Sequence, residues 1–181
     1  MKLHFESNLD YQIQAIEAVS DLFRGQEVCR TEFTVTTKAP LSNVEDMSLN
    51  ALSQQFSLGI GESDLGIGNL LTLSDDELHK NLVEIQFRNG LTPSIELVSG
   101  DFSVEMETGT GKTYVYLRSV FELNKRYGFT KFIIVVPSVA IREGVYKTLQ
   151  ITEDHFRGLY GGTPFDYFIY DSNKVIQVRN F

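Results

Sequence analysis

Cysteine and long apolar runs are scarce in this sequence of 181 residues, and each shortage excludes a class of protein. Cys29 is the single cysteine, so no disulfide can form within the chain. No uninterrupted apolar run approaches the roughly 20 residues that a membrane-spanning helix needs. The first residues turn polar at once, without the apolar stretch of a signal peptide. We therefore expect a cytoplasmic protein with no membrane partner.

Basic residues are also few, with 16 Lys and Arg against 24 Asp and Glu, a formal net charge of −8. This balance argues against tight nucleic-acid binding by the chain alone, because phosphate neutralisation needs a Lys/Arg surface. The charge is uneven: residues 1–100 carry 15 acidic and 6 basic side chains, and residues 101–181 carry 9 and 10. A polyanion would therefore meet the second part.

Apolar side chains are plentiful. The chain is 42% hydrophobic, with 13 Phe and 8 Tyr, which is enough for a real core and excludes wholesale disorder. At about 150 residues per domain, the length fits one compact domain, or one with a sizeable insertion.

The first hundred residues contain an amphipathic helix and a region of different composition. Apolar residues at three- and four-residue steps predict a helix over 9–23. β-branched and aromatic residues favour a strand over 27–37. Residues 39–79 contain seven acidic side chains and no Lys or Arg, which predicts an acidic, loop-rich insertion. A solvated loop is the favoured interpretation, and a partner-docking arm is the alternative.

A β-hairpin is predicted after this insertion. Residues 82–87 alternate in side-chain type, Asn89-Gly90 is a turn signal, and 94–98 fit a return strand.

The most informative stretch is M-E-T-G-T-G-K-T, residues 106–113. The phosphate-loop pattern requires Gly, four residues, then Gly-Lys-Ser/Thr; here Met106 replaces the leading Gly. Glycines let backbone N–H groups turn inward around phosphate oxygens, and the following helix adds its positive end. In such a loop Lys112 would reach the β- and γ-phosphates of ATP, and the Thr113 hydroxyl would hold Mg²⁺.

The flanks of the loop match the context that this motif requires. Alternation over 101–106 predicts a strand before it, and 113–127 predict a helix after it. The apolar run 131–136 fits a strand buried on both faces, and another helix is expected from Ser138. This order predicts an α/β fold, in which parallel strands flanked by helices form part of a RecA-like phosphate-loop domain.

The loop, together with I-I-V-V-P-S-V-A-I-R-E-G-V at 133–145, resembles the first two motifs of superfamily 2 helicases. Within that group the chain is most similar to the Res (restriction) subunit of type III restriction–modification enzymes. The similarity runs from about residue 101 to 181 and takes in the first helix. The resemblance implies an ATP-dependent hydrolase that acts on double-stranded DNA, with a separate nuclease domain and a methyltransferase (modification) subunit that recognises the site.

The resemblance also assigns roles to individual residues. Gln12 in Y-Q-I-Q-A-I would read adenine, with Phe5 or Tyr11 near the base; the alternative is a polar residue on an amphipathic helix. Residues of the second motif would touch the nucleic-acid backbone, although Arg142 also fits a surface salt bridge. The nucleotide loop comprises Thr108, Gly109, Thr110, Gly111, Lys112 and Thr113, and the DNA contacts are Pro137, Ser138 and Arg142.

One acidic motif does not lie where the helicase pattern requires it. Asp76 to His79 spell the D-E-x-H box with which helicases hold Mg²⁺, but they precede the loop, whereas the family places this box after it. Ser74 and Glu77 predict a helix capping box instead. No such carboxylate box follows Thr113. We therefore expect a fragment of a larger motor, with weak nucleotide binding and negligible turnover.

Three domain segments follow: an adenine-motif helix at 1–25, a β-rich region with the insertion at 26–100, and the first part of a helicase ATP-binding lobe at 101–181. Two other functions stay open. One is a different phosphate-loop enzyme such as a nucleotide kinase, although kinases of this size carry the loop near the N-terminus. The other is a noncatalytic interaction module with a vestigial loop, against which the intact Lys112 and Thr113 argue.

Overall fold

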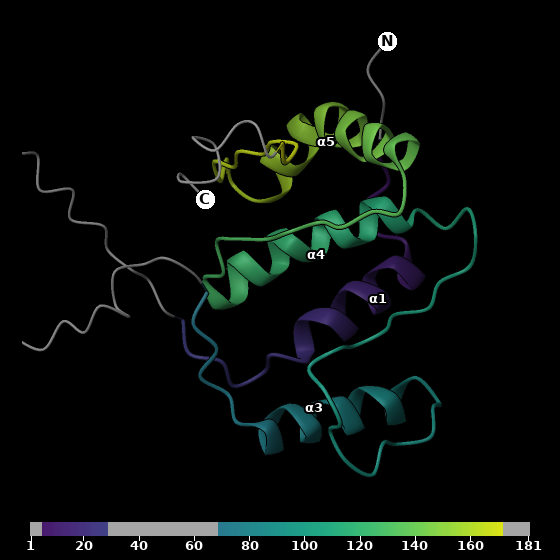
Figure 1. Ribbon diagram of the computed structural model, residues 1–181, viewed down its shortest axis with the longest axis vertical. Coiled ribbons are helices and arrows are strands. Elements are labelled where there is room, and N and C mark those ends of the chain that lie inside the picture. The colour runs from purple at the N-terminus through teal and green to yellow at the C-terminus, as the bar shows by residue number, and fades with distance from the viewer. Residues whose placement is uncertain (1–4, 29–68, 172–181) are drawn as a thin grey trace, which may run out of the picture.

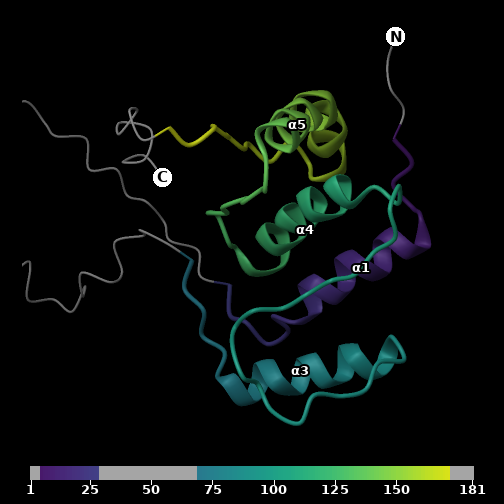
Figure 2. The ribbon, with the colours of Figure 1, turned by 45° about the vertical axis from the view of Figure 1, so that its right-hand side comes forward.

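The described part of the protein is built from helices (Figure 1). The structure, a computed structural model, describes residues 5–28 and 69–171. Within these ranges the helices are α1 (Asp10–Asp21), α3 (Asp75–Arg88), α4 (Lys112–Tyr127) and α5 (Val139–Leu159). Helix α4 lies between α5 and α1, and α3 lies on the other side of α1 (Figures 1 and 2). No helix of these ranges is long and apolar enough to cross a membrane.

Helix α1 confirms the helix predicted over 9–23. Its buried residues Gln12, Ile16 and Ser20 are spaced by four and form one stripe. The Tyr127 hydroxyl of α4 donates to the Ser20 carbonyl at 2.8 Å, where both groups are buried. Helices α1 and α4 begin at the same end of the molecule (Figures 1 and 2), which brings Gln12 to the start of α4.

Helix α4 confirms the helix predicted over 113–127 and is bounded by two left-handed glycines, Gly111 (φ 83°) and Gly128 (φ 75°). The Gly128 N–H donates to the Asn124 carbonyl, so the last turn is closed. The apolar face of α4 packs against α5, whose Phe156 is fully buried and stacks on Phe121 with ring centroids 4.8 Å apart. This aromatic cluster joins α4 to α5.

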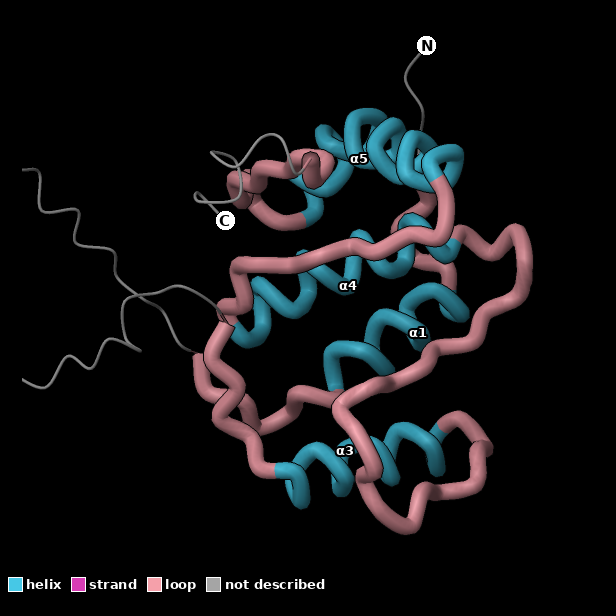
Figure 3. Tube along the Cα trace, in the orientation of Figure 1, coloured by secondary structure: helices cyan, strands magenta, loops and turns pink. Residues whose placement is uncertain are grey.

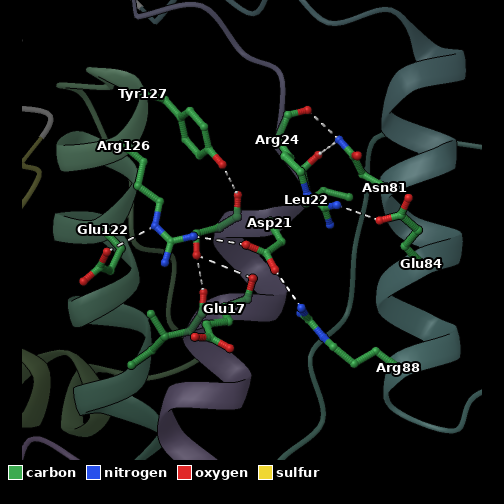
Figure 4. A network of polar contacts seen from close by, with 12 residues as sticks. Glu17, Asp21, Leu22, Arg24, Asn81, Glu84, Arg88, Glu122, Arg126 and Tyr127 are labelled. Atoms are coloured by element: carbon green, nitrogen blue, oxygen red, sulfur yellow. Dashed lines mark hydrogen bonds and ion pairs between the residues drawn. The ribbon is translucent and has the colours of Figure 1, made fainter.

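Ion pairs and amide hydrogen bonds join α1 to both of its neighbours, α3 and α4 (Figure 4). Asp21 accepts from Arg88 of α3 at 2.8 Å and from Arg126 of α4 at 3.1 Å. The amide of Asn81 donates to the carbonyls that follow α1, at Leu22 and Arg24. The end of α1 is therefore fixed to α3 and α4 at once.

The predicted hairpin is wrong. Residues 82–87 belong to α3, and residues 94–98 are irregular, with Ile95 96% exposed (Figure 3). The buried residues of α3, Leu78, Asn81 and Ile85, follow helical steps. The alternation that suggested a strand spans only six residues, too few to outweigh a helix that is already capped at Ser74.

The predicted α/β fold is also wrong: the described residues contain helices and loops but no strand, and hence no parallel sheet (Figure 3). The segments 101–106 and 131–136 are irregular, and Ile133 and Val135 are 78% and 88% exposed. A strand needs a neighbour that accepts and donates its backbone hydrogen bonds. Neither segment has such a neighbour in the described ranges, so β-propensity alone does not make a strand.

Part of the predicted organisation lies outside the described residues. This applies to nearly all of the predicted strand at 27–37 and to most of the acidic insertion at 39–79; the last residues of that range begin α3. The edges of this gap are joined, because the Gln26 amide donates to the Leu70 carbonyl at 3.0 Å and accepts from the Thr72 N–H at 2.9 Å. The chain thus leaves and re-enters the described fold at neighbouring points.

Candidate phosphate-binding site

The glycine-rich segment that precedes α4 forms a tight turn with two left-handed residues. Gly109 and Gly111 have φ values of 86° and 83°, a region that side chains disfavour. Between them, the Thr110 hydroxyl donates to the Glu107 carbonyl at 2.7 Å and braces the turn. Positive φ at alternate residues is the kind of backbone geometry that turns successive N–H groups toward one side. The loop conformation therefore fits an anion-binding role.

Lys112 and Thr113 are the first two residues of α4. The first turn of this helix contains no acidic side chain, so its positive end is not neutralised locally. Lys112 is exposed and forms no salt bridge with the described residues. The site thus brings together a cation and a helix N-terminus, which bind phosphate, and a hydroxyl, which is a ligand for Mg²⁺.

Gln12 contacts the loop directly, across 98 residues of sequence. Its Nε2 donates to the Thr110 carbonyl at 2.9 Å, and the side chain is buried in α1. Its Oε1 is buried and has no hydrogen-bond partner among the described residues. The structure therefore brings Gln12 together with the predicted nucleotide loop, at the loop backbone.

An aromatic cluster supports the first turn of α4. The Tyr114 hydroxyl is 2.9 Å from His155 Nε2 of α5, and Phe5 stacks on the Tyr114 ring at 6.3 Å between centroids. Burial raises the pKa of the Tyr114 hydroxyl, and Arg118 opposes this effect. From the sequence no role was expected for Tyr114, although it directly follows Thr113, and His155 was expected to be an ordinary residue because it has no metal-ligand spacing.

The two aromatic residues proposed for the base lie in different surroundings. Phe5 packs in the aromatic cluster, whereas Tyr11 is 47% exposed and lines an open groove of about 1510 Å³. This groove lies between α1, α3 and the segment that leads into the loop, and Thr110 also lines it. Tyr11 is therefore the more accessible of the two.

The residues predicted to contact DNA lie at the start of α5. The Ser138 hydroxyl caps α5 by accepting from the Ile141 N–H at 3.3 Å, and Pro137 is exposed. Arg142 pairs with its neighbour Glu143 at 3.0 Å. No hydrogen bond or ion pair within the described residues joins Pro137, Ser138 or Arg142 to the phosphate loop.

The misplaced D-E-x-H sequence serves the start of α3. Glu77 accepts from the Ser74 N–H at 2.8 Å and the Ser74 hydroxyl accepts from the Glu77 N–H, so the predicted capping box is confirmed. The hydrogen bonds that the Ser74 N–H and then the Ser74 hydroxyl donate to the Glu77 carboxylate lower the pKa of this carboxyl. His79 Nε2 lies 2.9 Å from the Ser94 carbonyl. Both side chains are thus engaged in local structure.

Comparison with known proteins finds one family along most of the chain. The family described as "Type III restriction enzyme, res subunit" matches residues 7–163. The matched range includes Gln12, the glycine-rich loop and the start of α5.

Individual relatives carry the same description. The EcoPI Res subunit of Escherichia phage P1 is 30% identical over 161 residues, which are 86% of this chain and 14% of that protein. The EcoP15I Res subunit of Escherichia coli is 40% identical over 95 residues, 50% of this chain and 10% of that protein. The StyLTI Res subunit of Salmonella typhimurium is 48% identical over 65 residues, 35% of this chain and 7% of that protein. The chain thus spans at most about one seventh of each relative.

Proposed function

The chain belongs to the family of type III restriction enzyme Res subunits, and on that premise we propose that it forms the ATP-binding portion of a DNA-dependent ATPase and endonuclease. One observation carries this proposal. The turn with left-handed Gly109 and Gly111 leads directly into the uncapped, cation-bearing start of α4. That combination suits the terminal phosphates of a nucleoside triphosphate.

Each residue of the loop has a distinct task in this proposal. The backbone N–H groups of Thr108 to Gly111 surround the phosphates, and the Lys112 ammonium neutralises their charge. The Thr113 hydroxyl would hold Mg²⁺, which when bound would offset the negative charge of the phosphates. Gln12 Oε1, a buried acceptor without a partner among the described residues, suits the amino group of adenine.

Contacts beyond the nucleotide are part of the same proposal. Pro137, Ser138 and Arg142 touch the backbone of double-stranded DNA from the start of α5, where Arg142 would exchange its exposed Glu143 partner for phosphate. Translocation and cleavage are carried out in the cytoplasm, with a methyltransferase subunit that supplies site recognition. Residues 1–25 supply the adenine motif, and residues 101–181 supply the first part of the ATP-binding lobe.

Hydrolysis by these 181 residues is expected to be negligible. No D-E-x-H or D-E-A-D sequence follows the loop within them. Phosphoryl transfer depends on several positioned groups acting together, including one that orients the attacking water. The loop therefore predicts binding, and the sequence around it predicts no efficient turnover.

A titration with a fluorescent ATP analogue in Mg²⁺ tests the proposal. Lys112→Ala should weaken binding at least tenfold, because it removes the charge-assisted contact to the terminal phosphates. Lys125→Ala is the matched control: Lys125 lies at the other end of α4, over the Tyr160 ring, and its loss should leave affinity unchanged. Phosphate release is assayed in the same samples. Unchanged affinity in Lys112→Ala would refute the phosphate site, and robust turnover would refute the predicted inactivity.

A further inference from the structure

We propose that Gln12 is a positioning residue for the phosphate loop, and that it acts on the loop backbone whatever base the nucleotide carries. This inference rests on the proposed nucleotide function. Gln12 is 6% exposed, and its Nε2 donates to the Thr110 carbonyl at 2.9 Å. A carbonyl oxygen can only accept, so this contact assigns the amide nitrogen to the loop.

The hydrogen bond fixes the orientation of one peptide unit in the loop. In a planar trans peptide the C=O and the next N–H point in opposite directions. Because Gln12 holds the Thr110 carbonyl toward α1, the Gly111 N–H must point away from α1. Gly111 is the N-cap of α4, where such N–H groups bind anions. Gln12 thereby aims a phosphate donor without touching the phosphate.

The Gln12 amide lies so close to Gly111 that it would have to shift to admit a side chain there. A Cβ on Gly111 would lie 2.7 Å from Gln12 Nε2, a separation that real Cβ atoms essentially never show. The amide of Gln12 therefore occupies the space on this side of Gly111 and restricts the loop sterically as well as by its hydrogen bond.

Gln12 lies on a helix that contacts α4 near both of its ends. Directly before α1, the Ser7 carbonyl accepts a hydrogen bond from Arg118 of α4, and Phe5 stacks on Tyr114. At the far end of α1, Tyr127 bonds the Ser20 carbonyl. Because α1 is attached to α4 on both sides of Gln12, the amide is held in place relative to the loop that it positions.

Two variants and one control separate positioning from base reading. Gln12→Ala removes the amide, and Gln12→Met keeps a side chain of similar length without a donor. Gln14→Ala changes an exposed glutamine on the same helix and is the matched control. Each protein is titrated with Mg-ATP and with inorganic tripolyphosphate, which has no base, and hydrogen exchange of residues 108–113 is measured without ligand.

In both Gln12 variants the backbone amide hydrogens of residues 108–113 should exchange several-fold faster than in the parent protein. Those of α3 and α5 should exchange at the parent rate. Both variants should lose about tenfold affinity for tripolyphosphate, as expected when one buried hydrogen bond is lost. The loss for ATP should be at least as large, because the proposed contact of Gln12 Oε1 with adenine is removed as well. Gln14→Ala should match the parent protein in every measurement. If Gln12→Ala does not fold, Gln12→Met decides.

Three results would overturn the inference. Loop exchange that stays at the parent rate would show that Gln12 does not hold the loop. A loss confined to ATP, with tripolyphosphate binding retained, would show a base contact alone. Faster exchange throughout α1, α4 and α5 would show a merely structural residue. If the parent protein binds neither ligand, the proposed function fails, and loop exchange in the unliganded protein still decides the role of Gln12.

Discussion

At Gly111 the backbone conformation and the neighbouring side chain impose the same restriction. The residue has a φ of 83°, which costs any side-chain-bearing residue energy, and Gln12 Nε2 lies 2.7 Å from the position of a Cβ. Gly109 has a similar φ of 86°, but no atom lies within 4 Å of the position that a Cβ would take there. Substitutions at the two glycines therefore distinguish the cost of conformational strain from the cost of steric collision.

Gly111→Ala should lower the free energy of unfolding by about 2 kcal/mol, since strain and collision both act. Gly109→Ala should cost about 1 kcal/mol, since only strain acts. Urea denaturation of both variants measures the difference. Equal losses would mean that Gln12 moves aside at no cost, which would contradict the close fit at Gly111.

Helix α3 shows at the scale of an element how a start signal outweighs a short periodic pattern. The capping box at Ser74 satisfies N–H groups at both ends of a four-residue segment, and three acidic residues occupy the first turn. Leu78 and Ile85 then bury the apolar face against α1, in a cluster with Leu22. A strand over 82–87 would have broken this continuous helix.

Ser74→Ala should destabilise the protein by about 1 kcal/mol, because the first turn of α3 loses its cap. Thermal unfolding followed by circular dichroism measures the change. Ser99→Ala is the control, since the exposed Ser99 hydroxyl contacts only nearby Asp101 in the described structure. A Ser74→Ala variant as stable as the Ser99→Ala control would contradict the capping role.

The same cap predicts a dependence on pH. The folded pKa of the Glu77 carboxyl lies below its ordinary value of 4.5, because Ser74 bonds the charged form. The stabilisation is therefore fully present above pH 4.5 and is lost as the pH falls through the lowered pKa. Glu77→Gln should lessen the fall in stability between neutral pH and about pH 3. An unchanged pH profile in that variant would contradict the assignment.

At the scale of the whole molecule, Asp21 connects three helices (Figure 4). Its side chain is 19% exposed, and those of Arg88 and Arg126 are 47% and 36% exposed. Solvent therefore screens each pair, and the contribution of the pairs is modest. The arrangement also fixes the positions of the helices relative to one another, because one carboxylate holds α3 and α4 to the same turn of α1.

Asp21→Asn should lower the free energy of unfolding by about 1 kcal/mol, and by less in about 1 M salt. Glu84→Gln is the matched control, because the pair that it removes, Arg24–Glu84, is about half exposed at both partners. Its effect should be close to zero. Urea denaturation at two salt concentrations checks both variants; a larger loss for Glu84→Gln would contradict the central position of Asp21.

The sequence alone determined the features that depend on neighbouring residues. Three- and four-residue spacing of apolar positions marked α1, the apolar pattern after the loop marked α4, and Ser138 and Ser74 marked the starts of α5 and α3. The loop residues Gly109 to Thr113 and the family were also recognisable from the sequence. Helices form from hydrogen bonds between residues four apart, so local patterns specify them.

Only the tertiary structure decided what depends on distant partners. Strand propensity over 101–106 and 131–136 did not specify a sheet, because a strand exists only where another segment completes its hydrogen bonds. The Gln12 amide met the Thr110 carbonyl, 98 residues away, because α1 packs beside α4. Phe5, Tyr114 and His155 converged for the same reason. Such contacts leave no trace in local spacing, since the packing of separate helices creates them.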